Sequence, residues 1–419
     1  MATWRPRRGL GDPATGTPVD IGVVVFARSN TVIDYFARFN LSLTPIDSTS
    51  TSEHVEFSTS KVIDFVPPSQ EAFTTVLSAY LDQLHKYPTL QDGFNMTYPV
   101  ESDLLLSFGE FITKYGLEDL VFRAFLYLNS DEIDSLERGF LTTQHHSTTE
   151  MYRKAAEYLG SDVLLNSTVL AMDRSRPKEA RVAVQTTSGP KLLIAKSILS
   201  TIPPVVENMD GYDLSEGEKS LFRGFFANGY YTGVLNNTGL NKALIATAPG
   251  QPYGMPVLPG IHSAYPIPVG EGILQVFYGS PTVLPDEDVQ ADVIASVRRY
   301  HHENELPLSE SNWLKFSSHS PLNLMVSNSA IADGFYEKLL SLQGRRNTFY
   351  NGATWHAQDS SVLWKFTDDY IIPILLKSLE ERECLRWHRI ITYTKLPMWD
   401  VMKWHKFATW GRRLFFTHC

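Results

Sequence analysis

Apolar side chains recur at helical spacing across residues 71–84, and this periodicity predicts an amphipathic helix. A second strongly apolar segment spans residues 117–128, so we expect the region from about 31 to 143 to be mostly helical. A further helix is predicted to begin at the capping-box pattern of residues 147–150, Ser-Thr-Thr-Glu. It should end at Gly160, because glycine easily adopts the left-handed backbone that closes many helices.

Strand patterns follow that helix, with alternating or continuous apolar runs between turns rich in glycine and proline. The predicted strands lie at 163–172, 181–187, 192–194, 196–202, 229–235 and 272–279. The strand at 196–202 reads as buried and is ended by the pair Pro203-Pro204. A helix is predicted from Asp286 to Tyr300. Taken by itself, this order of elements indicates no more than a generic α/β protein.

Composition fits a folded enzyme that is large enough for two domains. The chain has 419 residues, of which 43% are apolar and 20% are charged, and this excludes a disordered chain. A net charge of −9 gives no basic field, so nucleic acid is not expected as a partner. No run reaches about 18 apolar residues, so no transmembrane segment is predicted. Two cysteines cannot form a disulfide framework in a chain of this length.

The segment that says most about function runs from Phe349 to Trp364. It reads as a buried strand, a Gly-Ala turn at Gly352-Ala353, a short loop, and a helix capped by Asp359 or Ser360. The N-terminus of a helix presents unpaired N–H groups and the positive end of the helix dipole. It therefore suits an anion, or a ring that becomes electron-rich on reduction.

This segment resembles the closing motif of the flavin-containing amine-oxidase superfamily, in the branch similar to β-cyclopiazonate dehydrogenase. The resemblance extends over residues 12 to 379 as a series of short motifs, and it implies FAD as the cofactor. Through the resemblance, the adenine is held by the backbone of Val169, and the turn at Gly352 approaches the flavin. The implied cofactor-binding residues are Asp20, Gly22, Val169, Thr201, Gly352, Ala353, Asp359, Ser360, Ser361 and Val362.

The implied fold is an α/β protein with a discontinuous Rossmann-like FAD-binding domain and an inserted α+β substrate domain. Residues 12–30, 145–205 and 340–379 are assigned to the FAD-binding domain, which is incomplete because its first βαβ unit is missing. Residues 31–144 and 206–339 are assigned to the substrate domain. Residues 380–419 form an atypical tail, with eight Lys/Arg against four Asp/Glu and four of the eight Trp.

The chain departs from this family at its start. Such enzymes open with a strand, a Gly-x-Gly-x-x-Gly turn and a helix that receives the pyrophosphate. The sequence contains no such turn, and only residues 19–22, Val-Asp-Ile-Gly, remain of the region that follows it in the family. We therefore expect weak dinucleotide binding, from either an absent upstream exon or a decayed paralogue. As written, the chain predicts a cytoplasmic protein, and secretion would require such an exon.

The predicted function is oxidation of a C–H next to nitrogen, or at a similarly activated carbon, in a small molecule. The resemblance implies an alkaloid or another secondary metabolite as the substrate, and oxygen as the electron acceptor. Two alternatives stay open. One is an inactive flavoprotein fragment, and the other is a membrane-peripheral protein that uses its basic, Trp-rich tail. The tail can also be read as translated non-coding sequence, since the resemblance stops at about Leu379.

Other chemistries find less support in the sequence. A Ser hydrolase would need a Gly-x-Ser-x-Gly elbow, which is absent. The adjacent histidines at 145–146 and 301–302 are expected to be solvated or at helix ends, because neighbouring residues rarely share one metal. Acidic residues at 131–132 and 286–288 are expected at helix N-termini. His319 is expected to be hydrogen bonded or packed, and Trp355 and Trp364 to be core or cofactor-edge residues.

Overall fold

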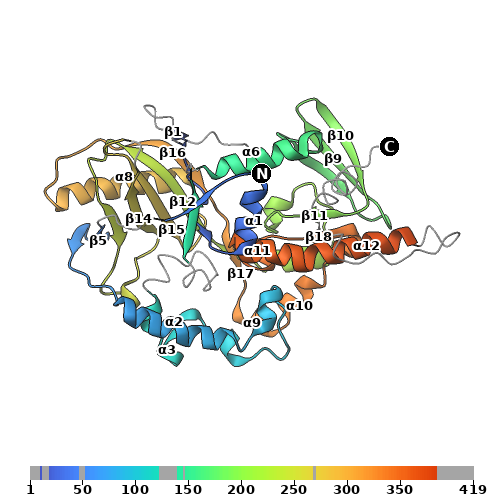
Figure 1. Ribbon diagram of the computed structural model, residues 1–419, viewed down its shortest axis with the longest axis horizontal. Helices are drawn as coiled ribbons and strands as arrows, with labels where there is room; N and C mark the ends of the chain where they lie inside the picture. Colours follow the sequence, from blue (N-terminus) through green and yellow to red (C-terminus); the bar gives the residue numbers. More distant parts are fainter. Residues whose placement is uncertain are drawn as a thin grey trace.

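The largest sheet in the computed structural model lies at one side of the molecule, with helix α8 (Asp286–Glu303) against it (Figure 1). The structure describes residues 10–11, 18–46, 52–121, 139–144, 147–267 and 270–384. The sheet has eight strands in the order β16-β12-β15-β14-β13-β5-β6, and β17 pairs with β12. Their bounds are β5 Ser52–Glu56, β6 Lys61–Ile63, β12 Phe226–Asn236, β13 Ala243–Ala246, β14 Gly260–Pro266, β15 Leu274–Ser280, β16 Asn312–Ser318 and β17 Leu322–Met325.

One face of this sheet forms a core with α8. Val289, Val293 and Val297 recur at a spacing of four on the helix and are buried against sheet residues that include Tyr231 and Tyr278. Because successive strand residues point to opposite faces, alternate residues of β12 and β15 form this core. Each buried valine contributes about 1.5–3 kcal/mol to stability relative to an exposed one. The other face of the sheet is turned away from α8.

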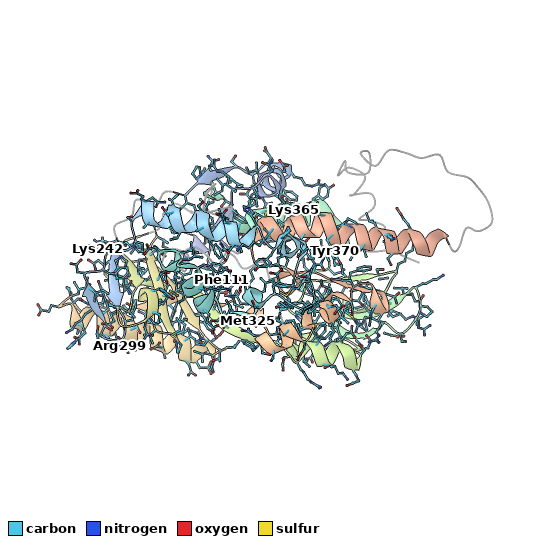
Figure 2. The ribbon with its side chains drawn as sticks, turned by 90° about the horizontal axis from the view of Figure 1, so that it is seen from below. Phe111, Lys242, Arg299, Met325, Lys365 and Tyr370 are labelled. Carbon is cyan, nitrogen blue, oxygen red and sulfur yellow. The ribbon has the colours of Figure 1, made fainter. Side chains whose placement is uncertain are left out.

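A second group of strands lies on the other side of the molecule, beside the long C-terminal helix (Figure 1). One sheet is a three-stranded antiparallel unit, ordered β10-β9-β8, and the other is a parallel pair of β11 and β18. Their bounds are β8 Thr168–Asp173, β9 Ala180–Thr186, β10 Gly189–Ala195, β11 Ile198–Ser200 and β18 Thr348–Tyr350. In Figure 2, Lys242 and Arg299 mark the side of the large sheet, and Lys365 and Tyr370 lie along the long helix.

The long helix is built from three consecutive segments. Helix α11 (Ser360–Phe366) runs into a π-helical segment (Thr367–Ile371) and then into α12 (Ile372–Cys384). The sequence predicts that Pro373 bends or ends this helix, but the helix continues for eleven residues beyond it. Proline cannot donate a backbone hydrogen bond. The π-helical segment, in which the hydrogen-bonding pattern is shifted, ends at Ile371, just before this proline.

Further helices surround these units (Figure 1). Helix α1 packs against α11 in a core cluster of Phe26, Val32, Phe36 and Met151, with Trp364 beside it. Trp364 contacts the ring of Tyr35, with the ring centroids 4.4 Å apart. The bounds of the helices are α1 Asn30–Arg38, α2 Gln70–Leu84, α3 Phe108–Tyr115, α6 Thr148–Leu159, α7 Glu216–Phe222, α9 Asn328–Ala332 and α10 Phe335–Leu340. No helix in the described part of the chain is long and apolar enough to span a membrane.

Several predicted elements are confirmed. Helix α2 spans the predicted range, the antiparallel pair β9–β10 forms around Ser188, and α8 begins with three acidic residues. The expectation of a mostly helical region from 31 to 143 is wrong in part, because strands β4 (Leu43–Pro45), β5, β6 and β7 (Phe140–Thr143) lie within it. Strand β5 pairs in parallel with the distant β13, and local periodicity carries no signal for such pairing.

Some expectations fall outside the described residues. These are the histidines at 145–146, the acidic pair at 131–132, residues 12–17, and the tail beyond residue 384. The division into an FAD-binding and a substrate domain stays a prediction. The helix-end position expected for the second histidine pair is confirmed, because His301 and His302 lie in the last turn of α8. His301 is buried at the end of α8, where its Nδ1 lies 2.6 Å from the carbonyl oxygen of Pro307, while His302 is exposed.

Candidate functional site

Parallel strands β11 and β18 bring two distant segments to the same sheet edge. Ser200 pairs with Tyr350, and the backbone N–H of Asn351 donates to the carbonyl of Ser200 at 2.9 Å. The chain therefore leaves both strands at their carboxyl ends, where α/β folds commonly bind ligands. Thr201 and Gly352 follow directly. A Cβ atom added to Gly352 would lie 3.6 Å from the carbonyl oxygen of Thr201.

Gly352 has a backbone conformation that only glycine adopts readily. Its φ is 120° and its ψ is 178°, in a region essentially closed to residues with a side chain. The chain then makes a short 3₁₀ turn from Ala353 to Trp355. Trp355 is 1% exposed and stacks on Tyr350, with ring centroids 5.1 Å apart and planes 20° apart. The turn is thus fixed by Gly352 at its start and by the buried, stacked rings of Tyr350 and Trp355. Core packing for Trp355 matches the expectation.

A small pocket with a cavity volume of about 40 Å³ opens at this turn. It brings together three of the predicted residues, Thr201, Gly352 and Ala353. Its lining also contains residues that sequence reasoning missed: Ile202, Pro203, Pro321, Asn323, Leu324, Asn351, Thr354 and Gln358. Asn323 and Leu324 come from β17, so both halves of the molecule contribute to the pocket. Val169 is not part of this lining.

Asn351 is the chemically distinctive residue of the pocket. Its side chain is 8% exposed, and its Nδ2 donates to Thr367 Oγ1 at 2.7 Å. Its Oδ1 is buried and has no hydrogen-bond partner among the described residues. An unsatisfied buried acceptor costs about 1–3 kcal/mol, which a donor group of a bound ligand would recover. The pocket therefore fits a ligand that carries N–H or O–H donors.

The helix after this turn begins as the sequence predicts. Asp359, rather than Ser360, is the capping residue, and its Oδ1 accepts a hydrogen bond from the backbone N–H of Ser361 at 2.7 Å. The hydroxyl of Ser361 also donates to this carboxylate, so both side chains are occupied within the cap. The helical spacing of Leu363, Phe366, Tyr370 and Ile374 predicts a buried stripe, and all four side chains pack into one core cluster together with Trp355.

Asp20 and Gly22 lie between the large sheet and helix α6. The Asp20 carboxylate accepts a hydrogen bond from the backbone N–H of Thr148 at 2.8 Å, at the first residue of α6. The predicted capping box at residues 147–150 is therefore wrong, since the side chain of Ser147 makes no capping hydrogen bond. The cap comes from a residue distant in sequence instead.

The large sheet holds this segment from its other side. The side chain of Gln275 donates to the Asp20 carbonyl at 3.0 Å, and the Thr232 hydroxyl donates to the Ile21 carbonyl. His319 Nε2 lies 2.9 Å from the same Ile21 oxygen. His319 thus has the hydrogen-bonded role expected from the sequence. A Cβ atom at Gly22 would lie 3.7 Å from the His319 ring.

Val169 lies on β8, paired with Val184. Its carbonyl oxygen would be 3.2 Å from a Cβ atom at Gly211, whose φ is 84°. The chain at Gly211 therefore passes close to the backbone of Val169, in a conformation that favours glycine. Ser360 and Val362 lie in the first turn of α11.

Sequence reasoning missed a buried ionic cluster behind β18. The Arg174 side chain is fully buried, with Nε 2.7 Å from Asp213 Oδ1 and Nη1 2.9 Å from Glu218 Oε1. Arg174 Nη1 also donates to the Tyr350 hydroxyl at 3.1 Å, and this hydroxyl donates to Glu218 at 2.6 Å. Burial opposes ionisation of Glu218, but hydrogen bonds from Tyr350, Ser215 and Arg174 outweigh it and lower its pKa to about 2.

The cluster fixes the strand that carries the candidate site. Burial alone would lower the pKa of Arg174, but its interactions with Tyr350, Asp213 and Glu218 raise it above its usual value. The sequence holds one signal in this region, since Ser215 and Glu218 form a true capping box at the start of α7. That pattern predicts a helix start but not a buried arginine. Among the described residues, no three His, Cys, Asp or Glu side chains gather as a metal site would require.

Curated relatives identify the class of the protein. No family model matches the chain. The FAD-dependent oxidoreductase oblC of Cochliobolus heterostrophus is 36% identical over 401 residues, which cover 88% of this chain and 83% of the relative. The FAD-dependent oxidoreductase pigF of Monascus ruber is 33% identical, with 88% and 83% covered. Beta-cyclopiazonate dehydrogenase of Aspergillus flavus is 28% identical, with 85% and 82% covered.

The chain belongs to this family of FAD-dependent oxidoreductases, and its cofactor is FAD. The resemblance inferred from the closing motif is confirmed. Among solved structures, the fatty acid isomerase from P. acnes matches with a TM-score of 0.67 at 16% identity, covering 87% of this chain and 89% of that chain. A putrescine oxidase triple mutant matches with a TM-score of 0.57 at 14% identity, covering 88% and 91%. These likenesses confirm the predicted fold class. The comparisons give no support to the two alternative functions, an inactive flavoprotein fragment and a membrane-peripheral protein.

Proposed function

We propose that the protein oxidises a small organic molecule, a secondary metabolite, at a C–H bond next to nitrogen or at a similarly activated carbon. The observation that carries the proposal is the junction of β11 and β18. There, Gly352 adopts a conformation that only glycine adopts readily, against Thr201, and the pocket is lined by Asn351, whose buried side-chain oxygen has no donor among the described residues. FAD bound at this junction supplies the acceptor for a hydride equivalent.

The residues proposed to hold the cofactor act in different ways. Gly352 leaves the space that a side chain would occupy, and Asn351 Oδ1 would accept a hydrogen bond from a donor group of the cofactor. The first turn of α11, capped by Asp359, contributes the positive end of a helix dipole, which favours negative charge. Ala353 and Thr201 complete the lining of the pocket. Asp20, Gly22, Val169 and residues 360–362 are proposed contacts through the family resemblance.

The proposed substrate and acceptor follow from the relatives. Beta-cyclopiazonate dehydrogenase is named for oxidation of a small organic molecule, and this supports a substrate of that class. The resemblance to amine oxidases supports molecular oxygen as the final electron acceptor. The protein then contributes a dry surface and alignment of the C–H bond, which together lower the barrier to hydride transfer.

The visible absorption spectrum of the purified chain tests the proposal. Bands near ~375 and ~450 nm after incubation with FAD and removal of free cofactor would show a bound oxidised flavin. Heat-denatured protein carried through the same procedure is the control for adventitious cofactor. Because the sequence lacks the Gly-x-Gly-x-x-Gly turn, we expect these bands at less than one FAD per chain. A chain that is folded by circular dichroism but shows no flavin bands would contradict the proposed function.

A further inference from the structure

Four aromatic rings gather on the face of the large sheet that is turned away from α8. They belong to Tyr230 on β12, His262 and Tyr265 on β14, and Phe277 on β15. In the strand register, Tyr230 is opposite Gly279, and Phe277 is opposite both Thr232 and Ser263. Their chain neighbours Tyr231, Ile261, Ala264, Val276 and Tyr278 are buried in the core with α8. Since strand side chains alternate, the rings lie on the opposite face.

An irregularity in β14 brings His262 onto this face. The register between β14 and β15 shifts between Ile261 and Ser263, so His262 is the extra residue of a β-bulge. Bulges redirect a side chain and occur frequently beside active sites. The His262 ring lies parallel to Tyr230, with centroids 5.9 Å apart and planes 23° apart, and it also contacts Phe277 at 5.9 Å. Tyr265 meets the edge of Phe277 at 5.9 Å.

The four rings do not bury one another. Each of the four residues keeps an intermediate part of its surface exposed, whereas the residues of the α8 face are buried. Gly279 lies on the same face as Phe277, two residues along the strand. A Cβ atom at Gly279 would lie 3.4 Å from the Leu258 side chain and 3.9 Å from the His262 ring. A larger side chain there would occupy the space beside His262.

One strand of the aromatic face, β12, pairs with a strand that lines the candidate cofactor pocket. The backbone N–H of Tyr230 donates a hydrogen bond to Ser320 Oγ at 3.0 Å, and Ser320 immediately precedes the pocket residue Pro321. Strand β17, which contributes Asn323 and Leu324 to the pocket, pairs with β12 just before Tyr230. Thr232 and Gln275 on the same face hold residues 20–21 through hydrogen bonds. On β12, Tyr230 therefore lies between the residues that pair with β17 and Thr232, which holds this segment.

The His262 and Tyr230 rings carry no charge near neutral pH. Burial lowers the pKa of His262 to about 4, so its imidazole stays neutral. Burial, and then the neighbouring Tyr265, raise the pKa of Tyr230, so its hydroxyl stays protonated. Flat and partly exposed rings favour stacking with another flat ring.

We propose that Tyr230, His262, Tyr265 and Phe277 form the substrate-binding surface, and that they select a planar, uncharged aromatic ring system in the substrate. This inference rests on the proposed function, which it deepens by naming the substrate class. The rings bind and orient this part of the substrate by stacking, with the oxidised C–H directed toward the pocket at Gly352. An aliphatic amine has no flat ring that could stack on these four side chains.

Binding of indole, measured by saturation-transfer NMR and isothermal titration, tests the inference without reference to turnover. The chain is compared with Phe277→Leu, which removes a ring, and Gly279→Leu, which fills the space beside His262 without removing one. Phe108→Leu, which replaces a half-exposed ring on α3, is the matched control. n-Butylamine is the aliphatic probe. Circular dichroism and bound FAD, read from the visible spectrum, are recorded for every variant.

We expect both substitutions to weaken indole binding by about tenfold or more, with unchanged flavin content, and Phe108→Leu to leave it unchanged. Indole binding that survives both Phe277→Leu and Gly279→Leu would overturn the inference. So would tighter binding of n-butylamine than of indole. A chain that binds indole in this manner but holds no flavin would contradict the proposed function and leave the aromatic surface supported, so the two failures are distinguishable.

Discussion

The Tyr350 hydroxyl donates to the Glu218 carboxylate at 2.6 Å, and this bond ties the strand of the candidate site to helix α7. Arg174 joins both residues, so the strand that ends at Gly352 is fixed from behind by a buried charge cluster. The cluster lies outside the pocket lining. Its role is to position the turn, and this gives a first prediction about stability.

Arg174→Met should destabilise the fold by about 3 kcal/mol, because it removes the fully buried partner of Glu218 and Asp213 and leaves them, among the described residues, paired only with the partly exposed Arg346. Urea unfolding followed by circular dichroism measures this change. Arg181→Met, which removes an arginine that is partly exposed, is the control and should stay within about 0.5 kcal/mol. Equal midpoints for the two variants would show that the cluster does not support the fold.

Glu218 should make stability depend on pH in the acidic range. Its pKa is about 2 in the folded protein against an ordinary value of 4.5, so its contribution is complete above pH 4.5. The contribution is lost as the pH falls from 4.5 toward 2, because protonation removes the charge that the folded state stabilises. Unfolding midpoints measured between pH 6 and 2.5 should fall more steeply for the wild type than for Glu218→Gln. Parallel curves would contradict this assignment.

Asp20→Ala should cost about 1 kcal/mol of stability, because the carboxylate caps the N-terminus of α6. Asp20→Asn should recover most of the loss, since an amide oxygen can accept the same hydrogen bond from Thr148. The exposed Asp82 on α2 provides the control, and Asp82→Ala should change stability by less than about 0.5 kcal/mol. Thermal unfolding distinguishes these outcomes, and a neutral Asp20→Ala would show that α6 needs no such cap.

Features that depend on local sequence could be predicted, whereas features that depend on contacts between distant segments could not. Helix α2, the strands around Ser188 and the turn at Gly352 are visible because periodicity and glycine requirements are local properties. The cap of α6 was assigned to Ser147, although Asp20 provides it, because a carboxylate from a distant segment leaves no mark in the helix sequence.

The residues of the candidate site also divide into those that the sequence predicts and those that only contacts between distant segments reveal. Gly352, Ala353 and Thr201 were predicted through the family resemblance, and the structure brings them to one pocket. Asn351 was missed, since its significance lies in a buried oxygen whose lack of a partner depends on the packing around Thr367. The Arg174 cluster was missed because it joins β8, α7 and β18, which are far apart in sequence.

Asn351→Ala should weaken FAD binding by about tenfold, because it removes the buried acceptor of the pocket. Stability in the absence of FAD should change by less than about 1 kcal/mol, since the loss of the bond to Thr367 is offset by removal of an unsatisfied group. Asn312→Ala, on β16 and exposed, is the control. Fluorescence titration with FAD reads the affinities, and an unchanged affinity for Asn351→Ala would remove this residue from the cofactor site.

The cofactor assignment at Gly352 is tested most directly by the flavin content of Gly352→Leu. A side chain at this position would enter the space against Thr201 in a backbone conformation that only glycine adopts readily. Gly109→Leu introduces the same side chain into open space on α3 and controls for the substitution itself. Gly352→Leu should fold but show no absorption near ~450 nm after incubation with FAD, whereas Gly109→Leu should match the wild type. A wild-type flavin content in Gly352→Leu would contradict this assignment.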